Sequence, residues 1–334
     1  MRNFLPWRVR RSIGVAVAVI CAAGLSACVT FDDPSASPSD APTLPSDTGG
    51  EDRPAPLLES ARFEVWDMHG SGTQPARSEK VIDAALARRG YWLSSSALGM
   101  PRAKAGARIG AGKPLAEITL PERAQVLDAK LRASGISGTS AMVMLDAEAF
   151  EPWESPKALA WFDQSARIAS QHFDNWFWYF QPGRVEAAVP SRFPTEEAYF
   201  DWYANQSFMK LAPAISVTVY HGRPQDAHNT KSAASRMRND KHLKRAIAFA
   251  HRMGKPLIVT LRADLSGKPR ATIMSRAALE ASWRPVFTRA GVDGIAIWND
   301  QPVDKVDFDR QWARQRIEPV LRTLLEERAA KVGG

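Results

Sequence analysis

The sequence predicts an α/β fold, a (β/α)8 barrel of TIM type that is distorted enough to have seven or eight strands. Apolar, strand-like runs recur along the chain and helical patterns alternate with them, as expected for a parallel sheet. Several of these runs are apolar at nearly every position, which is typical of strands buried on both faces. The region from residue 57 to residue 334 is long enough for one such barrel.

Seven segments have the branched and aromatic composition of strands, and an irregular eighth remains open. They are residues 62–67, 91–94, 141–145, 176–180, 214–220, 256–261 and 291–298.

Helical patterns occupy most of the intervals between these segments. They cover residues 78–89, 122–133, 155–172, 195–209, 232–252 and 275–290. Pro121 and Gly135 bracket the second helix, because proline suits the first position of a helix and glycine its end. Thr195, followed by two glutamates, is a typical N-cap.

The N-terminus has the pattern of a secretory signal, with an arginine-rich start followed by a short apolar run over residues 12–24. Leu25-Ser26-Ala27-Cys28 then resembles the lipobox of bacterial lipoproteins. This resemblance implies a signal peptide over residues 1–27 and lipidation of Cys28, which would anchor the protein to a membrane. Val29 in the next position implies delivery to the outer membrane of the cell envelope.

Residues 28–56 carry six acidic residues and one arginine among many prolines and serines, which predicts a flexible acidic tether before a domain at 57–334. The whole chain has a formal net charge of +8, and a basic cluster lies within residues 231–252. A basic domain favours anionic partners, although the basic helix is also expected to be a solvated face. No nucleic-acid motif is present, so nucleic acid is not an expected partner.

The chain has two cysteines, and removal of residues 1–27 would leave only Cys28. The folded domain is therefore expected to have no internal disulfide and no cysteine-bound metal. The histidines lack a compact metal-ligand spacing, so neither a metal nor another cofactor is expected.

Two carboxylates stand at the end of the third predicted strand, Asp146 and Glu148. Side chains at i and i+2 of a strand point to the same face, and the carboxyl ends of barrel strands carry active sites. Two nearby carboxyl groups do not both ionise easily, so one stays protonated and can donate to a leaving-group oxygen. The pair therefore suits acid catalysis on a glycoside. Asp67 and His69, at the end of the first strand, are candidates for binding a sugar hydroxyl.

Ordered landmarks along the domain resemble the hyaluronidase family of glycoside hydrolases. They are Val65-Trp66-Asp67, Gly112-Lys113-Pro114, Leu145 to Pro152 with both acids, Trp176 to Pro182, Trp202 to Ile215, and Gly291 to Trp298.

The resemblance implies hydrolysis, with retention, of a polysaccharide that contains N-acetylhexosamine, and the substrate's own acetamido oxygen acts as the nucleophile. Glu148 would be the proton donor and Asp146 would hold and polarise the site. Tyr179 would hydrogen-bond to the acetamido group or to the charge that develops on the sugar ring, and Trp298 would stack on a sugar face. The Trp between the two acids is Ala147 here. Ser216 replaces a family tyrosine that binds the acetamido group, and it is a candidate for binding the substrate in its place. Tyr220, on the same face as Ser216 by period two, is a further candidate ligand.

Two other functions remain open. Barrel muramidases that cleave peptidoglycan also carry a Leu-Asp-x-Glu strand end, although their histidine-containing strand is not seen here. A sugar-binding or scaffold lipoprotein that has lost catalysis is the non-enzymatic alternative, and Ala147 and Ser216 support it.

Overall fold

The computed structural model describes residues 63–70, 75–77, 79–94, 97–98, 120–147, 150–179, 181–183, 185–219, 230–263, 274–298 and 310–332. Three of the predicted site residues, Cys28, Glu148 and Tyr220, lie outside these ranges, as do the predicted signal peptide and tether.

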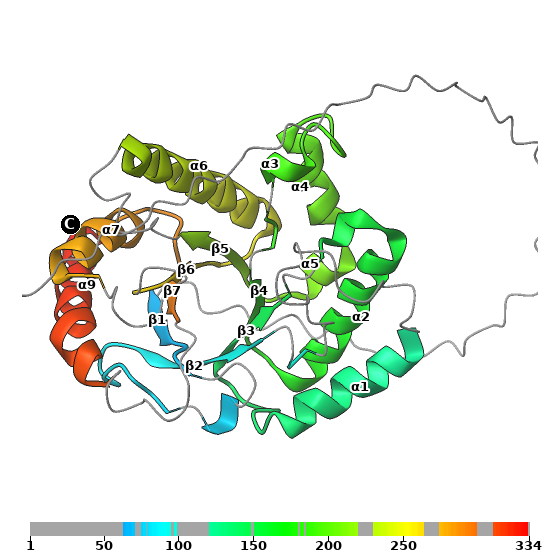
Figure 1. Cartoon of the computed structure of the whole chain (residues 1–334), viewed down its shortest axis with the longest axis horizontal. Helices are drawn as coiled ribbons and strands as arrows, with labels where there is room; N and C mark the ends of the chain where they lie inside the picture. The colour runs from blue at the N-terminus through cyan, green and yellow to red at the C-terminus, as the bar shows by residue number, and fades with distance from the viewer. Residues whose placement is uncertain are drawn as a thin grey trace, which may run out of the picture. The chain divides into compact units, whose positions relative to one another are not determined.

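Seven parallel strands form a nearly closed barrel in the described part of the chain (Figure 1). Their order in the sheet is β4-β3-β2-β1-β7-β6-β5, so β4 and β5 are its two edges. The strands are β1 (Glu64–Asp67), β2 (Arg88–Leu93), β3 (Met142–Asp146), β4 (Trp176–Tyr179), β5 (Ile215–Val219), β6 (Leu257–Leu261) and β7 (Gly294–Ile297). The predicted barrel is confirmed, and every strand overlaps its predicted segment, although β2 begins at Arg88, three residues before the predicted start.

A side-chain hydrogen bond joins the two edge strands, between which the described residues form no backbone ladder. Ser216 of β5 donates its hydroxyl to the backbone oxygen of Trp178 in β4 over 2.6 Å. Both residues are buried, so this bond satisfies a polar backbone group that the missing ladder would otherwise leave without its usual partner. Ser216 thus helps to close the barrel.

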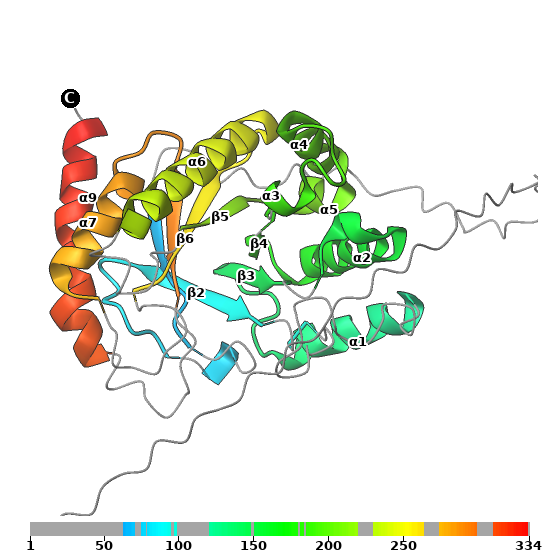
Figure 2. The ribbon, with the colours of Figure 1, turned by 45° about the horizontal axis from the view of Figure 1, so that its top comes forward.

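Helices pack around the outside of the barrel (Figures 1 and 2). They are α1 (Leu120–Ala133), α2 (Pro156–His172), α3 (Val185–Ala188), α4 (Glu196–Asn205), α5 (Ser207–Leu211), α6 (Thr230–Met253), α7 (Arg276–Phe287) and α9 (Glu318–Val332). Two short 3-10 helices, η1 (Pro75–Arg77) and η3 (Pro152–Glu154), and a π-helical segment, η6 (Ala313–Ile317), accompany them. None of the helices in the described ranges has the length and apolar content needed to cross a bilayer.

Side-chain caps fix the starts of three helices. Ser155, Thr195 and Ser275 each accept a hydrogen bond from the backbone amide three residues on, at 3.1 to 3.2 Å. The helix predicted over 195–209 is divided at Gln206, whose backbone is extended with φ −79° and ψ 140°. The chain therefore turns between α4 and α5.

The helix predicted over 78–89 is wrong. Residues 79–87 are not helical, and residues 88 and 89, at the end of the predicted helix, belong to β2. The cause is a long-range contact, because the Asp67 carboxylate accepts hydrogen bonds from the backbone amides of Val81 and Ile82. This segment lies along the outer side of β1, where a regular barrel would place a helix.

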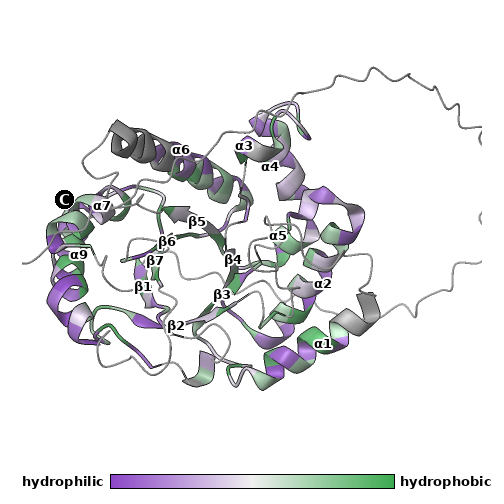
Figure 3. Cartoon of the chain, in the orientation of Figure 1, coloured by the Kyte–Doolittle hydropathy of each residue, from purple (hydrophilic) through white to green (hydrophobic). Residues whose placement is uncertain are grey.

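Strand residues alternate between two cores. One core fills the barrel interior and consists of Trp66, Met68, Trp92, Met142, Met144, Phe177, Tyr179, Ala214, Ile258, Ala296 and Trp298. The other lies between the strands and the helices, whose hydrophobic and hydrophilic residues alternate, most clearly in α1, α2 and α9 (Figure 3). Because the strands alternate strictly, the parity of a residue in its strand decides which core it faces.

Candidate active site

Asp146, the last residue of β3, faces the barrel interior. It follows Met142 and Met144 at intervals of two, and both of these methionines belong to the inner core. The indole Nε1 of Trp92 donates a hydrogen bond to its Oδ2 over 3.3 Å. Asp146 is 8% exposed and stands at the carboxyl end of the strand, where barrel enzymes hold their catalytic groups.

Tyr179 and Trp298 lie in the same part of the barrel interior as Asp146. Tyr179 ends β4 and is in register with Asp146. The Trp298 ring lies 5.7 Å from the Tyr179 ring and 5.0 Å from the Trp92 ring, measured between centroids. The structure therefore brings together three of the side chains that the sequence nominated.

Trp92 and Arg262 belong to this cluster, although sequence reasoning did not select them. The Arg262 guanidinium lies over the Trp298 ring, 4.7 Å from its centroid. Arg262 directly follows the last residue of β6, and Trp92 lies one residue before the end of β2. Their positions at or near the ends of predicted strands are the sequence feature by which they could have been selected. Trp298 is only 7% exposed, and its predicted stacking on a sugar stays a prediction.

Hydroxyl groups line the interior on β5 and β6. Ser216 and Thr218 alternate with the outward-facing Val217 and Val219, and Thr260 stands in register with Thr218. The Ser216 hydroxyl donates to the Trp178 oxygen, so its predicted substrate contact would have to coexist with this bond.

A buried network joins the segments that follow β3 and β4. The Tyr203 hydroxyl of α4 donates to Gln181 Oε1 over 2.8 Å, and Gln181 Nε2 donates to Glu151 Oε2 over 3.3 Å. Burial raises the pKa of Tyr203 well above its ordinary value, and Tyr199 and Glu151 add to this, so the phenol stays protonated. The network fixes the start of two loops that leave the candidate site.

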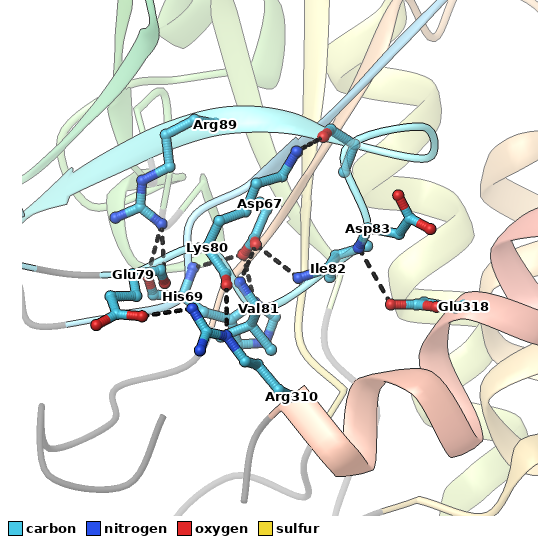
Figure 4. Close-up of polar contacts among 11 residues, drawn as sticks. Asp67, His69, Glu79, Lys80, Val81, Ile82, Asp83, Arg89, Arg310 and Glu318 are labelled. Atoms are coloured by element: carbon cyan, nitrogen blue, oxygen red, sulfur yellow. Dashed lines mark hydrogen bonds and ion pairs between the residues drawn. The ribbon is translucent and has the colours of Figure 1, made fainter. Parts of the chain in front are cut away.

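Asp67 and His69 lie on the outer side of β1 (Figure 4). Asp67 Oδ1 accepts from the amide and Nδ1 of His69, at 3.1 and 2.7 Å, and Oδ2 accepts from the amides of Val81 and Ile82, at 2.6 and 2.8 Å. Burial raises the pKa of Asp67, but the hydrogen bonds and charge of His69 and the amides outweigh it and hold the pKa below its ordinary value.

This placement separates Asp67 from the cluster around Asp146. Asp67 shares its parity with Val65 of the outer core, whereas Trp66 and Met68 face the interior. Its carboxylate makes its hydrogen bonds to His69 and to the amides of Val81 and Ile82, and these bonds anchor the segment of residues 79–87 against β1. The contact with a sugar hydroxyl predicted for Asp67 and His69 stays a prediction.

In residues 240–253 of the basic helix, where the structure describes the side chains, the lysines and arginines pair with neighbouring acids. Lys241 pairs with Glu196 at 3.1 Å, and Arg245 pairs with Glu186 at 2.6 Å and also contacts Glu196. Lys244 and Arg252 also pair with carboxylates. These pairs favour a solvated helix surface over a docking surface for a polyanion.

A hydrogen-bonded chain of Ser137, His172 and Asp128 occurs at the opposite end of the barrel. His172 Nδ1 lies 2.7 Å from Ser137 Oγ, and His172 Nε2 lies 2.8 Å from Asp128 Oδ1. The amide of Gly138, next to the serine, donates to the backbone oxygen of His172 and is not available to stabilise an oxyanion. The chain ties α1, α2 and the loop before β3 together, which is a structural task. No group of three or more metal-ligating side chains occurs among the described residues.

Comparisons with known proteins identify a structural likeness. No family model matches the sequence, and no curated protein sequence matches it. The crystal structure of bee venom hyaluronidase is similar with a TM-score of 0.55 at 16% identity, covering 78% of this chain and 99% of the bee protein. Bee venom hyaluronidase in complex with a hyaluronic acid tetramer gives a TM-score of 0.49 at 16% identity, covering 78% and 87%. The first likeness shows that this chain has the barrel fold of a hyaluronidase.

Proposed function

We propose that this chain is a glycoside hydrolase that cleaves polysaccharides containing N-acetylhexosamine, with Glu148 as acid and then base. The observation that carries the proposal is the grouping of Asp146, Tyr179 and Trp298 inside the barrel at the carboxyl ends of its strands. A carboxylate beside aromatic rings suits sugars, whose apolar faces stack on rings and whose hydroxyls bond to acids. The hyaluronidase-like fold agrees with it.

In the proposed reaction Glu148 donates its proton to the glycosidic oxygen as the bond to the anomeric carbon breaks. The acetamido oxygen of the same sugar attacks that carbon from the opposite face and forms a cyclic intermediate. Glu148, now ionised, takes a proton from a water that opens the intermediate, and the two displacements retain the configuration. Asp146 helps to keep Glu148 protonated before the first step, because two adjacent carboxylates repel.

Tyr179 supplies the polar contact in this scheme. Its hydroxyl would hydrogen-bond to the acetamido group and hold it in line for attack, which lowers the barrier by orientation. Attachment of the chain to the cell envelope through Cys28, in the outer membrane, is part of the same proposal. It rests on the signal and lipobox pattern of the sequence.

The proposal is tested by incubating the purified full chain with hyaluronan, chondroitin and peptidoglycan from acidic to neutral pH and measuring new reducing ends. Cleavage by the wild type, and none by Glu148→Gln with an unchanged unfolding temperature, is the expected result. Cleavage of peptidoglycan alone would favour the muramidase reading. Binding of a glycan without cleavage by either protein would favour the sugar-binding alternative.

A further inference from the structure

Four polar side chains face the barrel interior near the carboxyl ends of four strands that follow one another along the chain. Asp146 of β3 and Tyr179 of β4 are in register, and so are Thr218 of β5 and Thr260 of β6. The bond from Ser216 to the Trp178 oxygen aligns β5 with β4, and Thr218 stands two residues nearer the mouth than Ser216. Thr218 therefore lies on the strand that faces Tyr179 across the seam between β4 and β5, and Thr260 lies one strand further from it.

The two threonine hydroxyls differ from the serine hydroxyl beneath them. Thr260 is fully buried and the Thr218 Oγ1 atom is buried, yet within the part of the chain that the structure describes neither hydroxyl has a hydrogen-bond partner. A buried hydroxyl without a partner costs free energy in the folded protein, and a hydrogen bond to a bound water or ligand relieves that cost. These two lie side by side, since neighbouring strands are about 4.8 Å apart.

We infer that Thr218 and Thr260 form a paired hydrogen-bonding subsite for two adjacent polar substituents on one edge of a pyranose ring. This inference rests on the proposed function, which places a sugar at the mouth beside Asp146 and Tyr179. Each hydroxyl can donate and accept, so the pair matches vicinal sugar hydroxyls in either orientation. The pair selects sugars by the position of these substituents, and its hydrogen bonds are formed only when the sugar is present.

The test compares Thr218→Val and Thr260→Val, each made in the Glu148→Gln chain so that turnover does not interfere. Valine keeps the shape of threonine and removes the hydroxyl. Thr323→Val is the matched control, because its hydroxyl donates to the Pro319 oxygen within α9, outside the barrel interior. Calorimetry with hexasaccharides of hyaluronan and of chitin measures affinity, and thermal unfolding measures stability.

Each valine in the barrel is expected to weaken binding about 5- to 10-fold, the equivalent of one lost hydrogen bond, while the unfolding temperature stays the same or rises. The control should leave affinity unchanged. Unchanged affinity in Thr218→Val and Thr260→Val would overturn the inference and leave the hydroxyls with bound water only. A clearly lowered unfolding temperature would also overturn it, because the hydroxyls would then serve the fold.

The proposed function and this inference fail separately. Wild-type chain that binds a hexasaccharide through the threonines but cleaves nothing refutes the hydrolase alone. Wild-type chain that cleaves, together with valine variants that bind normally, refutes the subsite alone. If neither hexasaccharide binds to the Glu148→Gln chain, the subsite is refuted, and cleavage by the wild type decides the hydrolase.

Discussion

Asp67 and Asp146 each end a strand of the same barrel, and the sequence nominated both for the site, Asp67 as a ligand for a sugar hydroxyl and Asp146 as a catalytic residue. Asp67 faces outward, is fully buried, and accepts four hydrogen bonds from His69 and from the amides of residues 81 and 82. Asp146 faces inward, beside Tyr179, and accepts from the Trp92 indole. One acid holds a segment of the chain, and the other faces the mouth of the barrel.

The difference follows from parity. Asp67 shares its face with Val65, which packs in the outer core, whereas Asp146 shares its face with Met142 and Met144. A strand-end carboxylate can therefore take part in chemistry only if it alternates in phase with the interior. Where the carboxylate faces outward, backbone amides of a non-helical segment can fill its hydrogen-bonding capacity, as the amides of Val81 and Ile82 do for Asp67.

The largest effect should come from Asp146→Asn. Asparagine keeps an oxygen for the Trp92 indole but removes the charge that helps to keep Glu148 protonated, so turnover should fall about 100-fold or more. The unfolding temperature should change little. The rate of polysaccharide cleavage at saturating substrate measures the effect. If Asp67→Asn lowered this rate per folded molecule by the same factor, the distinction between the two acids would be wrong.

Asp67→Asn should act on stability instead. An asparagine amide offers one acceptor where the carboxylate offers two, so the free energy of unfolding should fall by about 3 kcal/mol. Urea unfolding measures this change. Asp83→Asn, an exposed acid in the same segment, is the control and should cost less than about 0.5 kcal/mol. If both variants were equally stable, the anchoring role of Asp67 would be wrong.

The stabilisation by Asp67 should depend on pH in one direction. Its pKa in the fold lies below the ordinary value of 3.8, so the unfolded chain binds the proton more readily. The contribution is fully present above 3.8 and is lost as the pH falls through the lowered pKa. The stability difference between wild type and Asp67→Asn should stay constant around neutral pH and shrink in acid. A difference that grew on acidification would contradict the lowered pKa.

The strands and most helices could be predicted because their signals are local. Apolar runs mark β3 and β6, and Ser155 and Thr195 cap their helices by contacts within three residues. The failure at residues 78–89 has a non-local cause. Ala84 to Arg89 has helix-forming composition. The amides of the preceding Val81 and Ile82, however, donate hydrogen bonds to Asp67, which lies outside the segment. Tertiary contacts of this kind override propensity.

The candidate site could be predicted where its residues lie at strand ends, because the sequence predicted where the strands end. Asp146, Tyr179 and Trp298 end or directly follow their strands, and the structure brings them together. Trp92 was not selected because its proximity to Asp146 depends on the pairing of β2 with β3, which one sequence does not state. The outward direction of Asp67 could not be predicted from side-chain size, because both faces of the strands carry large side chains. Trp66 and Met68 face inward, whereas Trp176 and Trp178 face outward.

The smallest expected effect is on stability, and it separates a buried hydroxyl that has a hydrogen-bond partner from one that has none. Ser216→Ala removes the donor to the Trp178 oxygen at the seam between β4 and β5, so the free energy of unfolding should fall by about 1 kcal/mol. Ser165→Ala is the matched control, because Ser165 is as buried but its hydroxyl has no hydrogen-bond partner among the described residues. Its removal should cost little or stabilise the fold. Urea unfolding of both variants measures the contrast. Equal costs would mean that packing alone holds the seam between β4 and β5. The hydroxyls of the inner face could then not be divided into those that close the barrel and those that are free to bind a sugar.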